Sequence, residues 1–94
     1  MTTAQGMAGA ILTFDLLLRH MGRIRPEPLD SFATALLFNW RLAALRKCLV
    51  VLEGNGIVRY IGQDRWELNP KYADAGSAVQ AARDARSDGH RRHE

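Results

Sequence analysis

The sequence is poor in the residues from which catalytic and metal sites are built, with one cysteine and three histidines among 94 residues. The single cysteine, Cys48, cannot form an internal disulfide, so we expect a reducing, cytoplasmic compartment. His20, His90 and His93 have no further ligands beside them, whereas a structural metal site needs about four. The sequence also lacks a phosphate-binding loop and a carboxylate pair placed for acid–base chemistry. We therefore predict no metal, no cofactor and no enzymatic activity.

Long hydrophobic runs are also absent. None approaches the roughly 20 residues that span a bilayer, so we expect no membrane association. Residues 7–21, MAGAILTFDLLLRHM, have the apolar character of a signal peptide. We do not predict one, because no Lys or Arg precedes this stretch and Asp15 interrupts it.

Acidic residues are the minority, with 10 Asp and Glu against 13 Lys and Arg, which gives a net charge of +3. Residues 1–72 hold nine basic and six acidic side chains, and residues 73–94 hold four of each, so the whole surplus lies in the first part. This balance suits an acidic partner such as nucleic acid without establishing one.

Three helices are predicted from the pattern of apolar residues. The first runs from Met7 to Met21 and ends at Gly22. Residues 23–28, RIRPEP, contain two prolines and are expected to be extended. A second helix starts at Asp30 or Ser31, either of which could cap its first turn. The face that it turns toward the core is predicted to consist of Phe32, Ala33, Leu36 and Leu37.

Asn39 favours a turn, after which we predict a third helix from Trp40 to about Glu53. Its core face is predicted to contain Leu42, Leu45, Leu49 and Leu52. GNG, residues 54–56, ends this helix, and the segments IVRYI and RWEL joined by GQD then predict a β-hairpin. The hairpin side chains expected to pack on the helices are Ile57, Val58, Tyr60, Trp66 and Leu68.

One small domain is the natural organisation for a chain of this length. We predict a flexible N-terminus over residues 1–6, the domain over residues 7–72, and a largely disordered or weakly helical tail over residues 73–94. The tail contains no large apolar residue except Val79, and so offers little to a core.

The stretch LRKCLVVLEGNGIVRYIGQDRWEL, residues 45–68, resembles the winged helix-turn-helix family. Members commonly end the recognition helix in a Leu-Glu pair, followed by a glycine, an aliphatic pair and a basic hairpin. The matching residues are Leu52, Glu53, Gly56, Ile57, Val58, Arg59 and Arg65. The resemblance covers about residues 8–70 and implies an α+β fold, mostly α, with three helices and a C-terminal two-stranded wing.

The resemblance also implies how such a domain would bind double-stranded DNA, with the third helix in the major groove and the wing along the backbone. On this basis we predict a small DNA-binding protein: a transcriptional regulator, or a plasmid or phage partition or replication factor. The residues expected to contact DNA are Asn39, Arg41, Arg46 and Lys47 from the third helix, Arg59, Gln63 and Arg65 from the wing, and Arg23 and Arg25 before the second helix.

The outer side of the third helix favours a different class of function. It collects mostly apolar residues, whereas a groove-reading helix normally presents polar ones. The candidate interface residues are Trp40, Ala43, Ala44, Val50 and Val51. A second subunit, a different protein, the tail or the first helix could cover them. The alternative hypothesis is therefore a protein–protein interaction module, an adaptor or inhibitor of a larger complex, and we expect a homodimer.

Overall fold

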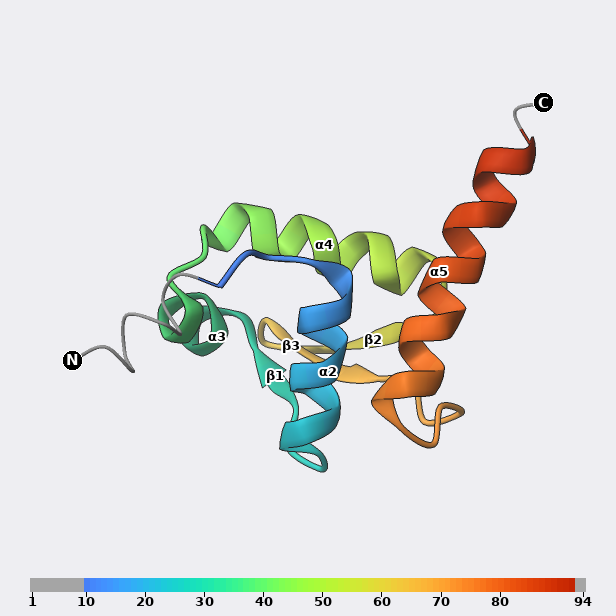
Figure 1. The fold of residues 1–94 in the computed structure, drawn as a ribbon. Helices are drawn as coiled ribbons and strands as arrows, with labels where there is room; N and C mark the ends of the chain where they lie inside the picture. The colour runs from blue at the N-terminus through green and yellow to red at the C-terminus, as the bar shows by residue number, and fades with distance from the viewer. Residues whose placement is uncertain (1–9, 93–94) are drawn as a thin grey trace.

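Four helices and a three-stranded antiparallel sheet make up the described part of the chain, residues 10–92, in a computed structural model (Figure 1). Met7 and the predicted flexible segment 1–6 lie outside the described residues. The elements are α2 (Phe14–Ile24), β1 (Leu29–Asp30), α3 (Ser31–Phe38), α4 (Leu42–Gly54), β2 (Val58–Gly62), β3 (Arg65–Leu68) and α5 (Ala75–Arg92). The predicted α+β class is thus confirmed, with one more helix and one more strand than expected. None of the helices within residues 10–92 has the length and apolar character needed to cross a membrane.

Helix α2 begins seven residues later than predicted. Thr13 is its N-cap, with an extended backbone and a hydroxyl that accepts a hydrogen bond of 3.1 Å from the Leu16 N–H. The Ala10 carbonyl accepts a hydrogen bond of 2.7 Å from Trp40 Nε1, so residue 10 is used to hold a distant loop. Gly22 does not end the helix, which continues to Ile24. The helical periodicity therefore predicted the existence of this helix correctly, whereas both predicted ends of the helix were wrong.

The extended segment after α2 contains the cis Arg25–Pro26 peptide bond and leads into a strand that the sequence did not predict. Leu29 pairs with Trp66 and Asp30 with Arg65, which places β1 beside β3. The strand order is β1-β3-β2, so the segment between α2 and α3 completes the sheet of the hairpin.

Helix α3 starts at Ser31 as predicted, and the Asp30 carboxylate accepts a hydrogen bond of 2.9 Å from the Ala33 N–H. Its predicted core face is wrong, because Phe32, Ala33, Leu36 and Leu37 are exposed. The buried side consists of Ser31, Thr34, Ala35 and Phe38. Hydrogen bonds make that burial possible for Ser31, which lies against Trp66 and Asp64.

Asn39 ends α3 in a left-handed conformation, with a φ of 58°, which confirms the predicted turn. Helix α4 starts at Leu42 rather than at Trp40, since Trp40 leaves the helix to stack on Phe38 with ring centroids 4.4 Å apart. Leu45, Leu49 and Leu52 are buried as predicted, and Leu42 is half-buried.

The predicted hairpin is confirmed as β2 and β3. Its turn places Gln63 and Asp64 at φ values of 57° and 62°, the left-handed values that a tight two-residue hairpin turn requires. Ile57, Val58, Trp66 and Leu68 are buried in the common core as predicted. Tyr60 is an exception, because about half of it stays exposed even though its ring contacts Trp66.

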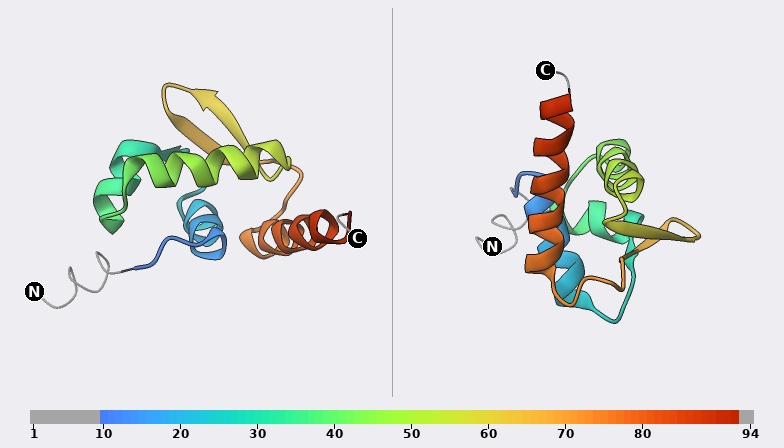
Figure 2. Two further views of the ribbon diagram at one scale, coloured as in Figure 1. Left: turned by 90° about the horizontal axis from the view of Figure 1, so that it is seen from above. Right: turned by 90° about the vertical axis from the view of Figure 1, so that its right-hand side faces the viewer.

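Residues 75–92 of the predicted largely disordered or weakly helical tail form helix α5, which is longer than a short frayed helix. Figure 2 shows α5 beside α2, on the opposite side of the molecule from the hairpin. Ala78, Val79 and Ala82 are buried in the same core as α2. The helices approach so closely that a Cβ at Gly22 would lie 2.7 Å from the Ala75 Cβ. Small residues rather than large ones therefore allow this helix to join the core.

Arg25 fixes the loop that leads into α5. Its guanidinium donates hydrogen bonds of 2.9 and 3.0 Å to the carbonyls of Tyr72 and Ala73. Further along α5, Arg83 forms an ion pair with Asp15 of α2. These contacts join residues far apart in the sequence and position the start of α5.

Candidate functional site

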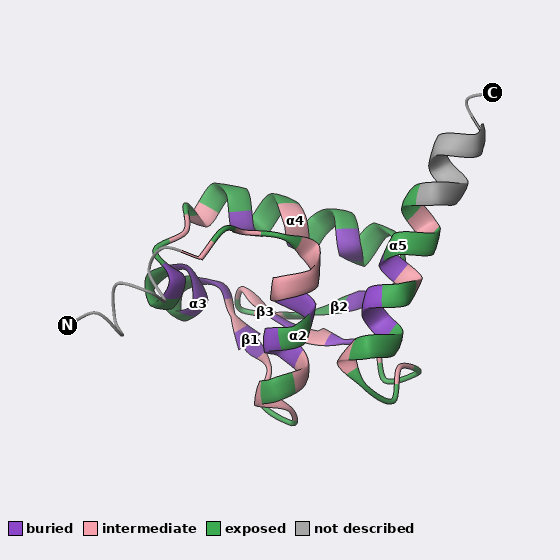
Figure 3. Cartoon of the chain, viewed as in Figure 1, coloured by how far each residue is buried: buried purple, intermediate pink, exposed green. Residues whose placement is uncertain are grey.

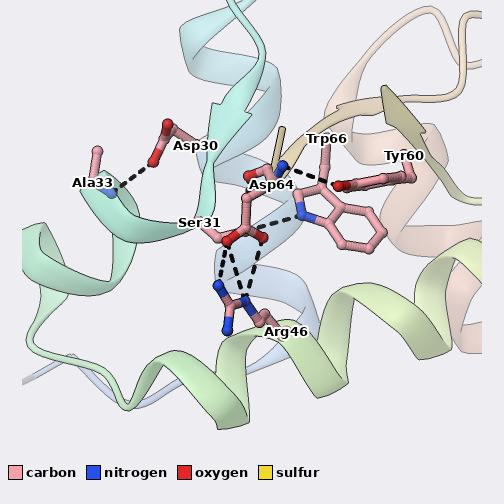
Figure 4. A network of polar contacts seen from close by, with 7 residues as sticks. All are labelled: Asp30, Ser31, Ala33, Arg46, Tyr60, Asp64 and Trp66. Atoms are coloured by element: carbon pink, nitrogen blue, oxygen red, sulfur yellow. Dashed lines mark hydrogen bonds and ion pairs between the residues drawn. The ribbon is translucent and has the colours of Figure 1, made fainter. Parts of the chain in front are cut away.

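A polar network ties the hairpin turn to α3 and α4 (Figure 4). Arg46 of α4 forms an ion pair with Asp64 at the turn, and its Nε lies 3.2 and 3.3 Å from the two carboxylate oxygens. The Asp64 carbonyl accepts bonds of 3.0 Å from both the N–H and the hydroxyl of Ser31. The Ser31 hydroxyl in turn accepts a bond of 3.0 Å from Trp66 Nε1. The Asp64 N–H donates to the Tyr60 hydroxyl, so both sides of this turn residue are engaged.

This arrangement holds the Arg46 side chain in place. The Arg46 guanidinium lowers the pKa of the Asp64 carboxyl, and hydrogen bonding to Asp64 raises the pKa of Arg46. The guanidinium also lies 5.2 Å from the centre of the Phe32 ring. The Arg46 guanidinium is thus already engaged within its own chain, which makes it less available for a contact with DNA.

The two hairpin cations predicted to contact DNA, Arg59 and Arg65, are also engaged. Arg59 forms an ion pair with Glu67, which lies opposite it on β3. Arg65 donates a bond of 3.2 Å to the Gln63 side chain at the turn, and its buried Nε has no hydrogen-bond partner within the described residues. The hairpin therefore offers less positive charge than its sequence suggests.

Residues 41–47 offer the clearest positive surface among the predicted contact residues. Arg41 is the N-cap of α4 and is exposed, and its side chain makes no capping hydrogen bond. The first turn of α4 contains no acidic residue. Ala43, Ala44 and Lys47 follow, and all three are exposed. A helix start with free N–H groups and adjacent cations attracts anions.

The remaining predicted DNA contacts lie elsewhere. Asn39 is the C-cap of α3, where its left-handed backbone ends the helix. Arg23 is exposed in the last turn of α2, and Arg25 bonds to the loop before α5. Figures 1 and 2 place this end of α2 away from α4. The structure therefore separates Arg23 and Arg25 from the first two turns of α4, where Arg41 and Lys47 lie.

Most of the predicted apolar outer face of α4 is open to solvent. Val50 is 56% and Val51 45% exposed, and the outer side of α4 is coloured as exposed along much of its length in Figure 3. Helix α5 packs on α2 instead, so the described part of the tail does not cover these valines. Trp40 is half-buried, stacked on Phe38 and bonded to the Ala10 carbonyl, so it belongs more to the fold than to this face.

The lone cysteine and a buried histidine carry shifted pKa values with simple causes. Burial raises the pKa of the Cys48 thiol, which leaves little reactive thiolate at neutral pH. Burial, followed by the charge of Arg23, lowers the pKa of His20. The His20 ring packs edge-on against Phe38, which suits the neutral form. Both side chains are accounted for by packing.

A cavity of about 440 Å³ lies between the end of α2, β1, β3 and the loop before α5. Met21, Leu29, Trp66, Leu68 and Tyr72 supply apolar walls. Of the residues predicted to contact DNA, only Arg25 lines it. Within residues 10–92 no group of three His, Cys, Asp or Glu side chains is placed to hold a metal ion.

Sequence reasoning missed the exposed face of α3 and the acidic partners of the arginines. The pairing of Arg59 with Glu67 had a detectable signal, because a tight turn at residues 62–64 brings these two positions opposite each other. The pairing of Arg46 with Asp64 had no signal in the sequence, since it depends on how the hairpin packs on α4. The exposure of Leu36 had no signal in the sequence either, because both sides of α3 are rich in apolar residues.

No protein-family model, curated protein or solved structure matches this chain. The functional interpretation therefore depends on the geometry of these surfaces.

Proposed function

We propose that this chain is a winged helix-turn-helix protein that binds double-stranded DNA, as a transcriptional regulator or as a plasmid or phage partition or replication factor. The element order supports this proposal, since a helix, an extended segment, two helices and a hairpin follow one another from α2 to β3. The pairing of β1 with β3 also supports it, because the extended segment then braces the wing.

The start of α4 is the observation that carries the DNA-binding proposal. An arginine at the N-cap cannot accept a hydrogen bond from the helix, so the first N–H groups remain available to a phosphate oxygen. Ala43 and Ala44 are small enough to let the backbone approach the DNA closely, and Ala methyl groups can contact thymine methyl groups. Lys47, one turn further along, adds a second exposed cation.

In this proposal the contacts differ in kind. Arg41 and the helix N-terminus bind phosphate and set the position of the domain on the DNA. Phosphate contacts of this kind carry no direct information about the base sequence. Arg46 acts mainly by holding the wing against α4 through Asp64. Affinity should therefore depend more on Arg41 and Lys47 than on the wing arginines.

Replacing Arg41 by aspartate should move DNA affinity and stability in opposite directions. Aspartate is a good N-cap, so the free energy of unfolding should rise by about 0.5–1 kcal/mol. The lost cation and the new anion should weaken binding to a random duplex at least tenfold and reduce the salt dependence of binding. Fluorescence anisotropy of a labelled duplex over a salt series, together with thermal unfolding, measures both.

Lys71→Asp is the matched control, because it changes the net charge equally at an exposed loop residue outside the proposed site. Its effect on binding should be much smaller. Undetectable binding of the unaltered protein at low salt would reject the DNA-binding proposal. Equal losses in the two variants would remove α4 from the site.

The second candidate function is a protein–protein interaction module that docks through the outer face of α4. The exposure of Val50 and Val51 favours it, since two adjacent aliphatic side chains in water gain from being covered. Val51→Glu should then abolish co-purification of a specific partner while leaving thermal stability unchanged. A partner retained by Val51→Glu would speak against this face.

A further inference from the structure

Helix α3 presents an unusually apolar surface, which we call the α3 patch: Phe32, Ala33, Leu36 and Leu37. Leu36 is 85%, Phe32 60% and Leu37 44% exposed. These positions lie on one side of the helix, since residues four apart are neighbours on its surface. No charged residue occurs in α3, from Ser31 to Phe38. Scattered exposed hydrophobic residues are common, whereas a contiguous uncharged patch on one helix face is a candidate interface.

We infer that the α3 patch is the contact surface for a second copy of this chain. A charged partner surface is disfavoured, because a charge set against Leu36 would lose its hydration without gaining a counter-ion. The part of the partner that faces Leu36 should therefore be apolar, and the chain itself provides such a surface in the α3 patch. A two-fold axis through α3 would place Leu36 of one copy against the same helix of the other.

The charges beside the patch fit this arrangement. The Arg46 guanidinium lies 5.2 Å from the centre of the Phe32 ring, and the Asp64 carboxylate is paired with it. The edge of the patch therefore carries one positive and one negative group. A two-fold axis reverses their order in the partner, so that each copy can offer opposite charges to the other. A surface with charge of one sign only would repel its own copy.

The area sets the expected strength of the contact. Phe32, Leu36 and Leu37 together expose roughly 300 Å² of apolar surface, which is less than half of the about 800 Å² that each partner buries in a standard interface. The dimer should therefore be of the weak, reversible kind, with dissociation in the micromolar range. Its formation does not require DNA.

Sedimentation velocity of the full chain without DNA, at concentrations from about 1 to about 300 µM, tests this inference. The unaltered protein should shift from monomer to dimer. Leu36→Glu and Leu36→Lys should both raise the dissociation constant at least tenfold, because either charge would be buried in the contact. Circular dichroism and thermal unfolding should show that both variants are folded, since Leu36 makes little contact with the core.

Ile11→Glu is the matched control, because Ile11 is an exposed isoleucine outside every surface proposed for binding. It should dimerise like the unaltered protein. Three results would overturn the inference: a monomer at every concentration, a Leu36 variant that still dimerises, or an equal loss with Ile11→Glu. Failure of DNA binding alone would leave it standing, because the measurement contains no DNA.

Discussion

Val79→Asn is expected to lower the free energy of unfolding by about 3 kcal/mol. Val79 is buried between α5 and the rest of the core, together with Ala78 and Ala82. Asparagine would remove an apolar side chain from this contact and place an amide where water cannot reach it. Chemical denaturation followed by circular dichroism measures the change, and the midpoint should fall without a change in slope.

Gln80→Asn provides the comparison, since the same residue would then stand at the neighbouring position, where the side chain is exposed. There we expect a change of about 0.5 kcal/mol or less. Similar small effects at both positions would mean that α5 does not pack on α2 in solution. A large effect confined to Val79 would establish α5 as part of the domain.

Leu49→Ala should cost about 3 kcal/mol of unfolding free energy. Leu49 is fully buried in the middle of α4, where it packs within the core shared with the sheet and α2. Truncation to alanine loses apolar burial and leaves a cavity that the surrounding residues fill only in part. The same denaturation measurement gives the difference.

The adjacent change Val50→Ala should alter stability by no more than about 0.5 kcal/mol, because Val50 lies on the solvent side of α4. The pair therefore reports which side of α4 faces the core. If Val50→Ala were the costly change, the helix would be rotated relative to this structure, and the proposals built on its outer face would fail with it.

The amino-acid sequence was informative where a single side of an element had to be apolar. Leu45, Leu49 and Leu52 define one face of α4, and the glycines after Glu53 define its end, so that helix and the hairpin could be predicted closely. Gly56 takes a φ of 74°, which few other residues tolerate.

The sequence was uninformative where packing decided between equivalent choices. Both sides of α3 are rich in apolar residues, and the choice depends on Ser31, whose hydroxyl serves both Trp66 and Asp64. Helix α5 was predicted only as a weak helix for a related reason. Its contact with α2 uses Gly22 and Ala75, which are too small to produce a hydrophobic pattern and yet allow close approach.

The candidate DNA-binding surface, too, could be predicted from the sequence only in part. The resemblance predicted nine contact residues along the chain, seven of them cations, but only the structure reveals that Arg46 and Arg59 have carboxylate partners. Charge counts describe the net field of a protein, whereas availability of a cation depends on tertiary contacts. The start of α4 became the strongest candidate because its cations lack such partners among the described residues.

The half-buried position of Cys48 has a practical consequence for spectroscopy. Its raised pKa keeps the thiol protonated at neutral pH, so alkylating dyes should attack it slowly. A cysteine introduced at the exposed position Gln80 would present an ordinary thiol to the same reagent. A fluorophore or spin label can thus be attached to α5 selectively, without first removing the native sulfur from the helix that it helps to pack.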